Sequence, residues 1–286
     1  MADNDGDVTV NPLGVCSIML FGHTPEEAIE TVLRSGATGI EWRVDDRGPG
    51  AGSDVFTDNR CTLRFEDVAR TVERCRRAGL EVVGLDTYVD TGDVATARRA
   101  AAAAAEAGVG WFRFRAPWRD GTAWSEQAQA ARRFVDELER ITSRHGVRAL
   151  LELHQRSICP SASLTARILD GADPALIGAI YDAGNLLVEG YEDHDTAIEL
   201  LGAHLAHVHV KNARYVPSEP GIPWVLQWSP MDDGLLDVVA LRRALHRGGY
   251  RGWLSLEDFT ADLAPVEALR RGLEVLDRAE PAMVTA

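Results

Sequence analysis

The sequence is poor in the features that mark secreted and membrane proteins. Its 286 residues include four cysteines, and none forms a CxxC pair, so we expect neither a disulfide scaffold nor a thiolate zinc site. No apolar run reaches the length of about 20 residues that a transmembrane helix needs. The N-terminal segment lacks the basic and apolar parts of a signal peptide. We therefore expect a cytoplasmic protein with free thiols and no membrane partner.

Positive charge is also scarce. Lysine and arginine number 30 against 44 aspartates and glutamates, which gives a net charge of -14. Nucleic-acid binding relies on a basic face that neutralises phosphates, so we expect no nucleic-acid partner. A hydrophobic content of 45% is enough for one large core. The length fits one TIM barrel, which typically takes roughly 250 residues.

Short apolar runs alternate with longer amphipathic segments, a pattern typical of βα units and a parallel sheet. The first helix is the clearest, because Thr24, Pro25 and Glu27 match an N-cap, a first-turn proline and a capping-box glutamate, and Gly36 ends it. The other expected helices are Arg64–Ala78, Asp93–Ala107, Ser125–His145, Leu164–Leu169, Asp195–Leu201, Leu235–Arg247 and Pro265–Arg278. The expected strands are Gly14–Phe21, Gly39–Arg43, Leu80–Leu85, Trp111–Arg115, Arg148–Leu153, Ile177–Tyr181, Leu205–Val210 and Trp253–Leu256.

Eight βα units favour a closed barrel over an open sheet, so the predicted fold is a single (β/α)8 TIM barrel. We expect the barrel domain at residues 13–280, a flexible N-terminal tail at 1–12 and a C-terminal tail at 281–286. Asp45–Asn59 is expected to be a loop. Asn212–Gly234, with four prolines, is expected to be a second loop and is the best candidate for a lid over the barrel mouth.

Ionisable residues stand at or near the ends of four consecutive strands, where a TIM barrel carries its active site. They are Glu152, Asp182, His209 and Glu257. Each residue alone is readily explained as a helix cap or an ion pair, but the four together indicate one divalent metal site. Three carboxylates and one imidazole suit Mn2+ best, with Mg2+, Co2+ or Zn2+ as alternatives. His207 shares a strand face with His209 but lies farther from the mouth, so we expect it in the layer below as a core histidine.

Four motifs resemble the sugar phosphate isomerase/epimerase family, the xylose isomerase-like TIM barrels that include ketose 3-epimerases and inosose dehydratases. They are LLELH at 150–154, YDAGN at 181–185, HVHVKN at 207–212 and GWLSLED at 252–258. The resemblance covers most of the chain from Leu13 onward and is most specific in the second half. The metal residues of the family fall on the same four positions named above.

The resemblance implies a divalent-metal-dependent isomerase or epimerase of a sugar or related polyol ketone. Glu152 and Glu257 would then be the catalytic acid/base pair, abstracting a proton next to a carbonyl while the metal stabilises an enediolate. A lyase or dehydratase that acts on a cyclic or sugar-derived keto substrate shares this first step and is the main alternative. Asn185 and Ile158 stand where ketose 3-epimerases often carry a histidine and a second glutamate, so the substrate and the branch stay open.

Two further classes of protein share this barrel fold. A non-catalytic binding barrel is compatible with those two departures from the epimerase pattern. A nuclease like the endonuclease IV relatives of this fold is disfavoured by the acidic charge and by the few histidines near strand ends. The partner we expect is a small sugar or polyol-derived molecule. Relatives are commonly dimers or tetramers, so a homodimer or a homotetramer is compatible with the resemblance.

Several polar residues near the strand ends are candidate substrate-binding groups: His154, Arg156, Asn185, Lys211, Arg214 and Arg115. Arg214 occupies the place of a substrate-contacting arginine in the epimerase branch. If the early-strand residues Arg43, Arg113 and Arg115 point inward, they favour an anionic substrate such as a sugar phosphate or a sugar acid. If they point outward, they form ion pairs with the surrounding helices.

Overall fold

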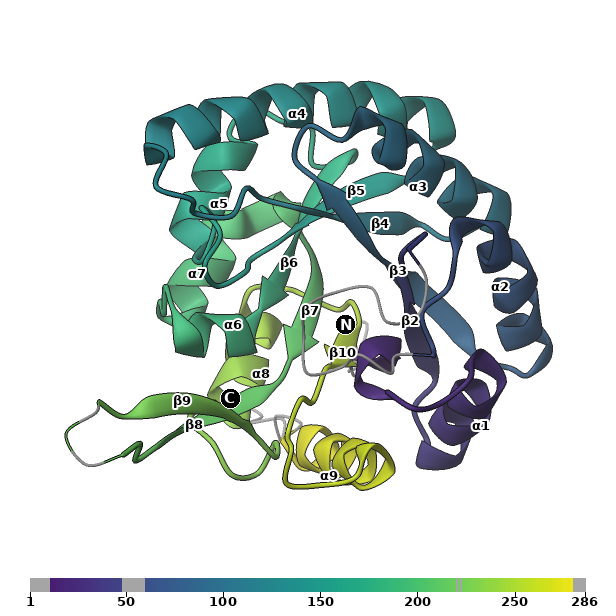
Figure 1. Ribbon diagram of the computed structural model, residues 1–286, viewed down its shortest axis with the longest axis vertical. Coiled ribbons are helices and arrows are strands. Elements are labelled where there is room, and N and C mark those ends of the chain that lie inside the picture. Colours follow the sequence, from purple (N-terminus) through teal and green to yellow (C-terminus); the bar gives the residue numbers. More distant parts are fainter. Residues whose placement is uncertain (1–10, 48–59, 220, 222, 280–286) are drawn as a thin grey trace, which may run out of the picture.

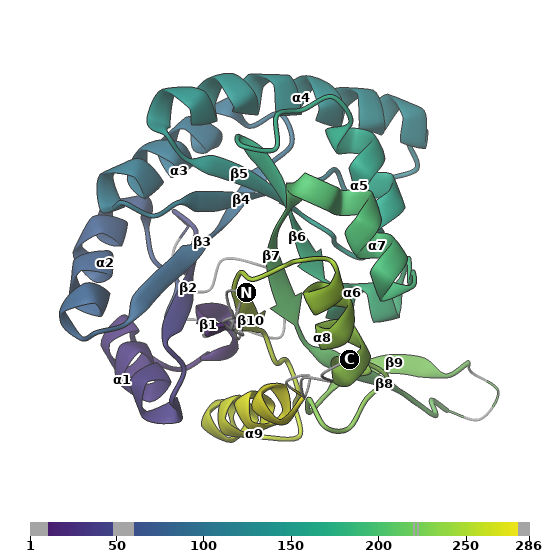
Figure 2. The same cartoon turned by 180° about the vertical axis from the view of Figure 1, so that it is seen from behind.

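The protein is described by a computed structural model at residues 11–47, 60–219, 221 and 223–279. Eight parallel strands close into a barrel in the spatial order β1-β10-β7-β6-β5-β4-β3-β2, and helices surround it (Figures 1 and 2). The predicted (β/α)8 barrel is therefore confirmed. The barrel strands are β1 Leu13–Cys16, β2 Gly39–Val44, β3 Glu81–Asp90, β4 Trp111–Arg115, β5 Arg148–Glu152, β6 Ile177–Asp182, β7 Leu205–Val210 and β10 Leu254–Leu256.

The expected helices are present, and one short helix after β6 was not expected. Its first turn is capped by Asp182, whose Oδ1 accepts the backbone N–H of Asn185 at 2.9 Å, so the residue that ends β6 also starts the helix. The α-helices are α1 Pro25–Ser35, α2 Val68–Arg77, α3 Val94–Ala107, α4 Trp124–His145, α5 Ala162–Leu169, α6 Ala183–Val188, α7 His194–Leu201, α8 Val238–Arg247 and α9 Pro265–Arg278.

The start of α1 follows the predicted capping box. Thr24 Oγ1 accepts the N–H of Glu27 at 3.3 Å, and Glu27 Oε2 accepts the N–H of Thr24 at 2.8 Å. Gly36 ends the helix in the left-handed region, with φ of 86°. These bonds satisfy backbone donors that a helix end otherwise leaves without partners.

The first strand is shorter than expected. We expected a strand over Gly14–Phe21, but β1 ends at Cys16 and a 3-10 helix occupies Ser17–Met19. Met19 and Leu20 are fully buried outside the sheet, so the apolar run continues into a packed turn. An apolar run alone does not show where strand pairing stops.

The prediction of a loop at 212–234 is wrong, because described residues of this segment form an antiparallel hairpin. Strands β8 Asn212–Val216 and β9 Val225–Ser229 pair along their whole length. The hairpin extends away from the barrel in both ribbon views (Figures 1 and 2). The prolines of this segment all fall outside the two paired strands, where they break no ladder hydrogen bond.

Asn11 and Pro12 are the first described residues, and they form hydrogen bonds with the segment around β10. Asn11 is buried, and its Nδ2 donates to the carbonyls of Tyr250 at 3.3 Å and Gly252 at 3.0 Å. Pro12 accepts the N–H of Leu254 at 3.0 Å. Residues 11 and 12 thus lie against the barrel, whereas residues 1–10, the expected C-terminal tail and most of the expected loop at 45–59 fall outside the described residues.

The barrel strands are buried on both faces, because helices cover the outside and side chains fill the inside. In β2 and β6 every residue is buried. Outside the sheet, α3 contributes fully buried alanines that allow close packing. Inside the barrel, several buried side chains are ionisable instead of apolar, and these lead to the candidate site. No helix of the described residues is both long and apolar enough to cross a membrane.

Candidate metal centre

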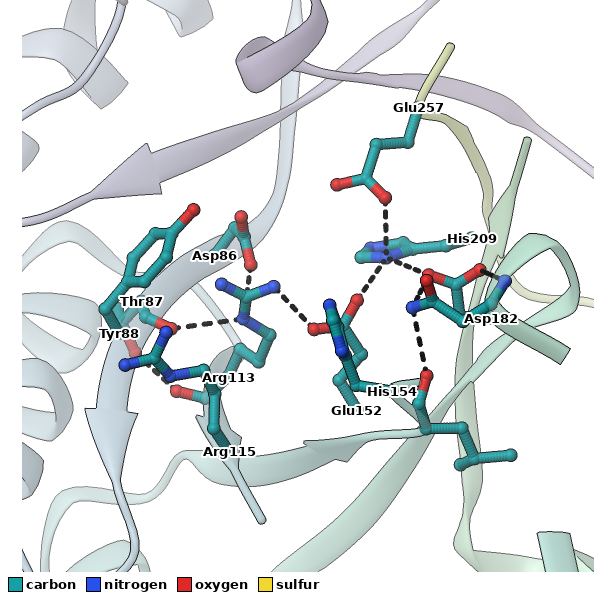
Figure 3. A network of polar contacts seen from close by, with 12 residues as sticks. Asp86, Thr87, Tyr88, Arg113, Arg115, Glu152, His154, Asp182, His209 and Glu257 are labelled. Atoms are coloured by element: carbon teal, nitrogen blue, oxygen red, sulfur yellow. Dashed lines mark hydrogen bonds and ion pairs between the residues drawn. The ribbon is translucent and has the colours of Figure 1, made fainter. Parts of the chain in front are cut away.

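The structure brings together the four residues predicted as metal ligands. Each offers one ligand atom, and these atoms all lie within 4.8 Å of one another. All four side chains are buried and converge from neighbouring strands (Figure 3). We call this set the strand-end cluster: Glu152 at the end of β5, Asp182 at the end of β6, His209 near the end of β7, and Glu257 directly after β10.

The imidazole of His209 is central to the cluster (Figure 3). Its Nδ1 lies 3.5 Å from Glu152 and 3.9 Å from both Asp182 and Glu257. This nitrogen is buried and forms no hydrogen bond within the described residues. A buried polar atom without a partner is costly, and a nitrogen lone pair facing three carboxylates is the arrangement that a cation satisfies. The donor set therefore fits a divalent metal ion.

Two buried cations balance the carboxylates. Nζ of Lys211 lies 2.6 Å from Asp182 Oδ2 and also contacts Glu257 Oε2. Nη1 of Arg113 lies 2.6 Å from Glu152 Oε2, and its Nε lies 2.5 Å from Asp86 Oδ1 (Figure 3). Buried carboxylates are stable only with such partners. Arg113 of β4 and Lys211, directly after β7, provide the positive charges that pair with the buried acids.

Burial and neighbouring like charges shift the pKa values of the cluster carboxylates in the direction opposite to these cations. Burial raises the pKa of Asp182 to about 7, because the pull of Lys211 in the other direction is weaker than desolvation together with the nearby glutamates. Burial also raises the pKa of Glu152, but Arg113 and His209 have the larger effect and hold it well below the usual range. Burial would lower the pKa of His209, yet Glu41 and Glu152 raise it well above its ordinary value. The cluster thus attracts positive charge, as a cation site does.

A second layer lies directly below the cluster. Both carboxylate oxygens of Glu41 on β2 lie 3.0 Å from Nε2 of His209. Nε2 of His207 lies 2.9 Å from Glu41 Oε2 and 3.0 Å from Ser255 Oγ. His207 is buried, so the prediction of a satisfied core histidine below the mouth is confirmed.

Two of the candidate substrate-binding residues lie beside the cluster. Nδ2 of Asn185 donates to Asp182 Oδ2 at 2.6 Å and to the carbonyl of Leu153 at 3.2 Å, so this buried amide orients a cluster carboxylate. The ring of His154 lies edge-on to Trp118, with centroids 4.9 Å apart, and burial lowers the pKa of this histidine. Lys211 contacts the cluster itself. Substrate contact by these residues stays a prediction.

Three other candidates lie apart from the strand-end cluster. Arg214 forms ion pairs with Asp233 and Asp262, which are exposed. Arg156 is exposed, has a positive φ of 64°, and donates its backbone N–H to Glu189. Arg115 pairs with Asp90 at 2.6 Å, at the ends of β4 and β3. Their substrate roles also stay predictions.

Tyr88 on β3 is a residue of this region that sequence reasoning missed. The guanidinium groups of Arg43, Arg113 and Arg115 each lie 4.8 Å from the centre of its ring. Arg43 also donates to the Tyr88 hydroxyl at 3.0 Å. These arginines are thus gathered around one inward-facing ring on the site side of the sheet. The sequence does contain a signal for this residue. Tyr88 stands two residues after Asp86, and residues two apart in a strand point to the same face.

Curated proteins that match the sequence do so over part of their length. The inosose dehydratase of Bacillus velezensis is 25% identical over 137 residues, which is 43% of this chain and 44% of that protein. The chain therefore spans less than half the length of the curated relatives that it matches.

Solved structures match over nearly the whole barrel. The 3-keto-D-glucoside 4-epimerase of E. coli, in its apo form, gives a TM-score of 0.71 at 16% identity and covers 94% of this chain and 100% of that one. The IOLI protein, in a structure with a bound zinc atom, gives 0.72 at 14% identity over 94% and 97%. At such identities the likeness shows the fold alone. The family description "Xylose isomerase-like TIM barrel" matches residues 29–279, and the chain therefore belongs to that family.

Proposed function

We propose that this protein is a divalent-metal-dependent isomerase or epimerase of a sugar or related polyol ketone. The observation that carries the proposal is the placement of Glu152 and Glu257. The two carboxylates approach His209 from different sides, with Asp182 on a third side (Figure 3). A pair of carboxylates on different sides of one bound substrate is what removal and return of a proton on opposite faces requires.

Four side chains would hold the metal, namely those of the strand-end cluster. Bound there, a divalent ion supplies Lewis acidity that polarises a carbonyl oxygen and the neighbouring hydroxyl. Mn2+ is our leading candidate for an oxygen-rich set with one imidazole, and Zn2+ is the alternative that the IOLI structure suggests.

The remaining work falls to the residues of the chain. One of Glu152 and Glu257 takes the proton from the carbon beside the carbonyl, and the other returns a proton. The ion pair with Arg113 fixes the position of the Glu152 carboxylate, and the contact with Lys211 fixes that of Glu257. Because both glutamates are nearly fully buried, bulk water has little access to compete for the proton.

A dehydratase is the second candidate, and two observations favour it. The curated relatives matched by sequence are named inosose dehydratases. Asn185 is hydrogen-bonded to Asp182, and Ile158 is buried and apolar, so neither supplies the extra polar groups expected for the ketose 3-epimerase branch. The same proton removal, followed by loss of a β-hydroxyl as water, would complete this reaction.

Deuterium exchange separates the candidates. The Mn2+-loaded protein is incubated in D2O with ketopentoses, ketohexoses and keto-inositols, and each mixture is followed by NMR. Deuterium beside the carbonyl with an inverted or isomerised product supports the proposal, whereas an enone product supports the dehydratase. No exchange from any of these ketones by metal-loaded protein would contradict both.

The matched control is a glutamate outside the cluster. Glu152→Gln is expected to abolish turnover and to leave the fold intact. Glu137→Gln removes a carboxylate that pairs with Arg98 and Arg140 on the helix surface, and it is expected to retain activity. Wild-type turnover by Glu152→Gln would remove this residue from the mechanism.

A further inference from the structure

We infer that Glu41 is a positioning residue for the metal centre: its carboxylate holds the His209 imidazole so that Nδ1 faces the strand-end cluster. This inference rests on the proposed metal site, and it assigns a role to a β2 residue outside the predicted ligand set. Glu41 is fully buried, and both of its oxygens lie 3.0 Å from Nε2 of His209.

The geometry of the ring fixes the direction of the hydrogen bond. An ionised carboxylate has no proton to donate, so Nε2 carries the hydrogen and Glu41 accepts it. The other nitrogen, Nδ1, then faces Glu152, Asp182 and Glu257, where a bound metal ion would replace its proton. A metal-ligating histidine typically donates its second N–H to a carboxylate, which fixes both the tautomer and the ring orientation.

Glu41 is itself held by a second imidazole of β7, which also contacts β10. His207 on β7 reaches its Oε2 at 2.9 Å, and the same Nε2 lies 3.0 Å from Ser255 Oγ on β10. Both imidazoles donate into one carboxylate, so Glu41 cannot turn toward one of them without losing the other.

The support continues to the opposite wall of the barrel. The ring of Trp111 at the start of β4 lies 4.9 Å, centroid to centroid, from that of His207. A Cβ on Gly84 would lie 2.1 Å from the Trp111 ring, so only glycine on β3 lets the indole take this position. The Trp111 indole therefore packs against the second imidazole that binds Glu41, which limits the movement of His207.

Metal affinity of purified, folded variants tests the inference. Glu41→Leu removes both acceptor oxygens at similar volume, and the Kd for Mn2+, measured by isothermal titration calorimetry, is expected to rise by about 10- to 100-fold. Glu41→Gln keeps one acceptor oxygen but not the charge, and it is expected to lose less. Ser255→Ala is the matched control, because it touches the support of His207 and not His209, and its Kd is expected to stay within about threefold of wild type.

A spectroscopic readout begins with the wild-type protein and therefore does not need Glu41→Leu to fold. Wild-type protein with 15N-labelled histidine is loaded with diamagnetic Zn2+ and examined by NMR. We expect the metal-bound shift at Nδ1 of His209 and a slowly exchanging proton on its Nε2. In Glu41→Gln this proton is expected to exchange faster.

The outcomes separate failure of the metal site from failure of the inference about Glu41. If wild-type protein binds neither Mn2+ nor Zn2+ at the cluster, the proposed metal site and the inference both fall. If wild type binds metal and Glu41→Leu binds it equally well, or if Nε2 of His209 is the metal-bound nitrogen, the inference about Glu41 alone is overturned. Should Glu41→Leu fail to fold, the NMR result on wild type and Glu41→Gln decides.

Discussion

Nη1 of Arg113 lies 2.6 Å from Oε2 of Glu152, and the same guanidinium reaches Asp86 on β3 with its Nε at 2.5 Å. One cation from β4 therefore neutralises two carboxylates inside the barrel. All three side chains are at least nine-tenths buried, so screening by water is weak.

Removal of this cation is expected to be strongly destabilising. Arg113→Met leaves Asp86 and Glu152 without their partner, and breaking a buried pair typically costs about 3–5 kcal/mol. Urea unfolding of chelator-treated protein measures the loss. The double variant Asp86→Asn, Arg113→Met is expected to recover part of it, since one stranded charge is gone. A loss below about 1 kcal/mol in the single variant would show that the guanidinium is not the partner these acids need.

Gly184 in α6 is expected to be intolerant of a side chain. A Cβ there would lie 2.1 Å from Cγ of Lys211 and 2.8 Å from its carbonyl oxygen. Gly184→Ala must therefore displace the side chain or the backbone of Lys211, and overpacking of this kind costs about 1–3 kcal/mol. Chemical denaturation provides the number. Gly110→Ala is the control, because nothing lies within 4 Å of its added Cβ, and equal stability losses in the two variants would refute the packing argument.

His194 at the start of α7 makes stability depend on pH. Its Nδ1 lies 2.7 Å from the Tyr181 hydroxyl, and burial lowers the pKa of this histidine despite the nearby Asp193, Asp195 and Asp237. The folded state thus resists a proton that the unfolded chain accepts below pH 6.5. Stability from the neutral imidazole is fully present above that pH and is lost as the pH falls.

The test compares urea unfolding at pH 7.5 and pH 5.5, values chosen to lie about one unit on either side of the ordinary pKa of histidine. Wild type is expected to lose more stability between these values than His194→Gln, whose amide does not titrate. His145→Gln, at the exposed end of α4, controls for loss of a histidine at the surface. The same pH dependence in wild type and His194→Gln would remove this residue as the cause.

Asn185 is expected to influence the metal and not the substrate alone. Its amide donates to Asp182 Oδ2 and to the carbonyl of Leu153, which ties a cluster carboxylate to the end of β5. Asn185→Leu is expected to raise the Kd for Mn2+ by about 10-fold, as loss of an outer hydrogen-bond partner typically does. Calorimetry measures this directly. Unchanged metal binding with weaker substrate binding would return Asn185 to the substrate-binding role predicted from the sequence.

The strand-end cluster could be found in the sequence because one rule governs all its members. Parallel strands of a barrel end at one mouth, so ionisable residues that end successive apolar runs must meet there. The positions of Asp182 and Glu257 could be predicted without knowing which strands pair across the barrel. The same reasoning placed His207 one layer below His209 from strand parity alone.

The partners of the cluster could not be found in this way. Glu41 is 168 residues from His209, and no local pattern pairs β2 with β7 across the barrel. Arg113 sits in a strand buried on both faces, so its sequence context does not distinguish an inward from an outward side chain. The β8–β9 hairpin was hidden by the prolines that flank its strands, because proline marks loops more strongly than short alternation marks strands.

The metal claim has one direct test. Crystals grown with excess Mn2+ are measured at a wavelength where manganese scatters anomalously. We predict one manganese peak per chain, bound by Glu152, Asp182, His209 and Glu257, and no peak at this place in Asp182→Asn crystals. A wild-type map with no peak among these side chains, or with manganese bound only elsewhere on the protein, would contradict the account.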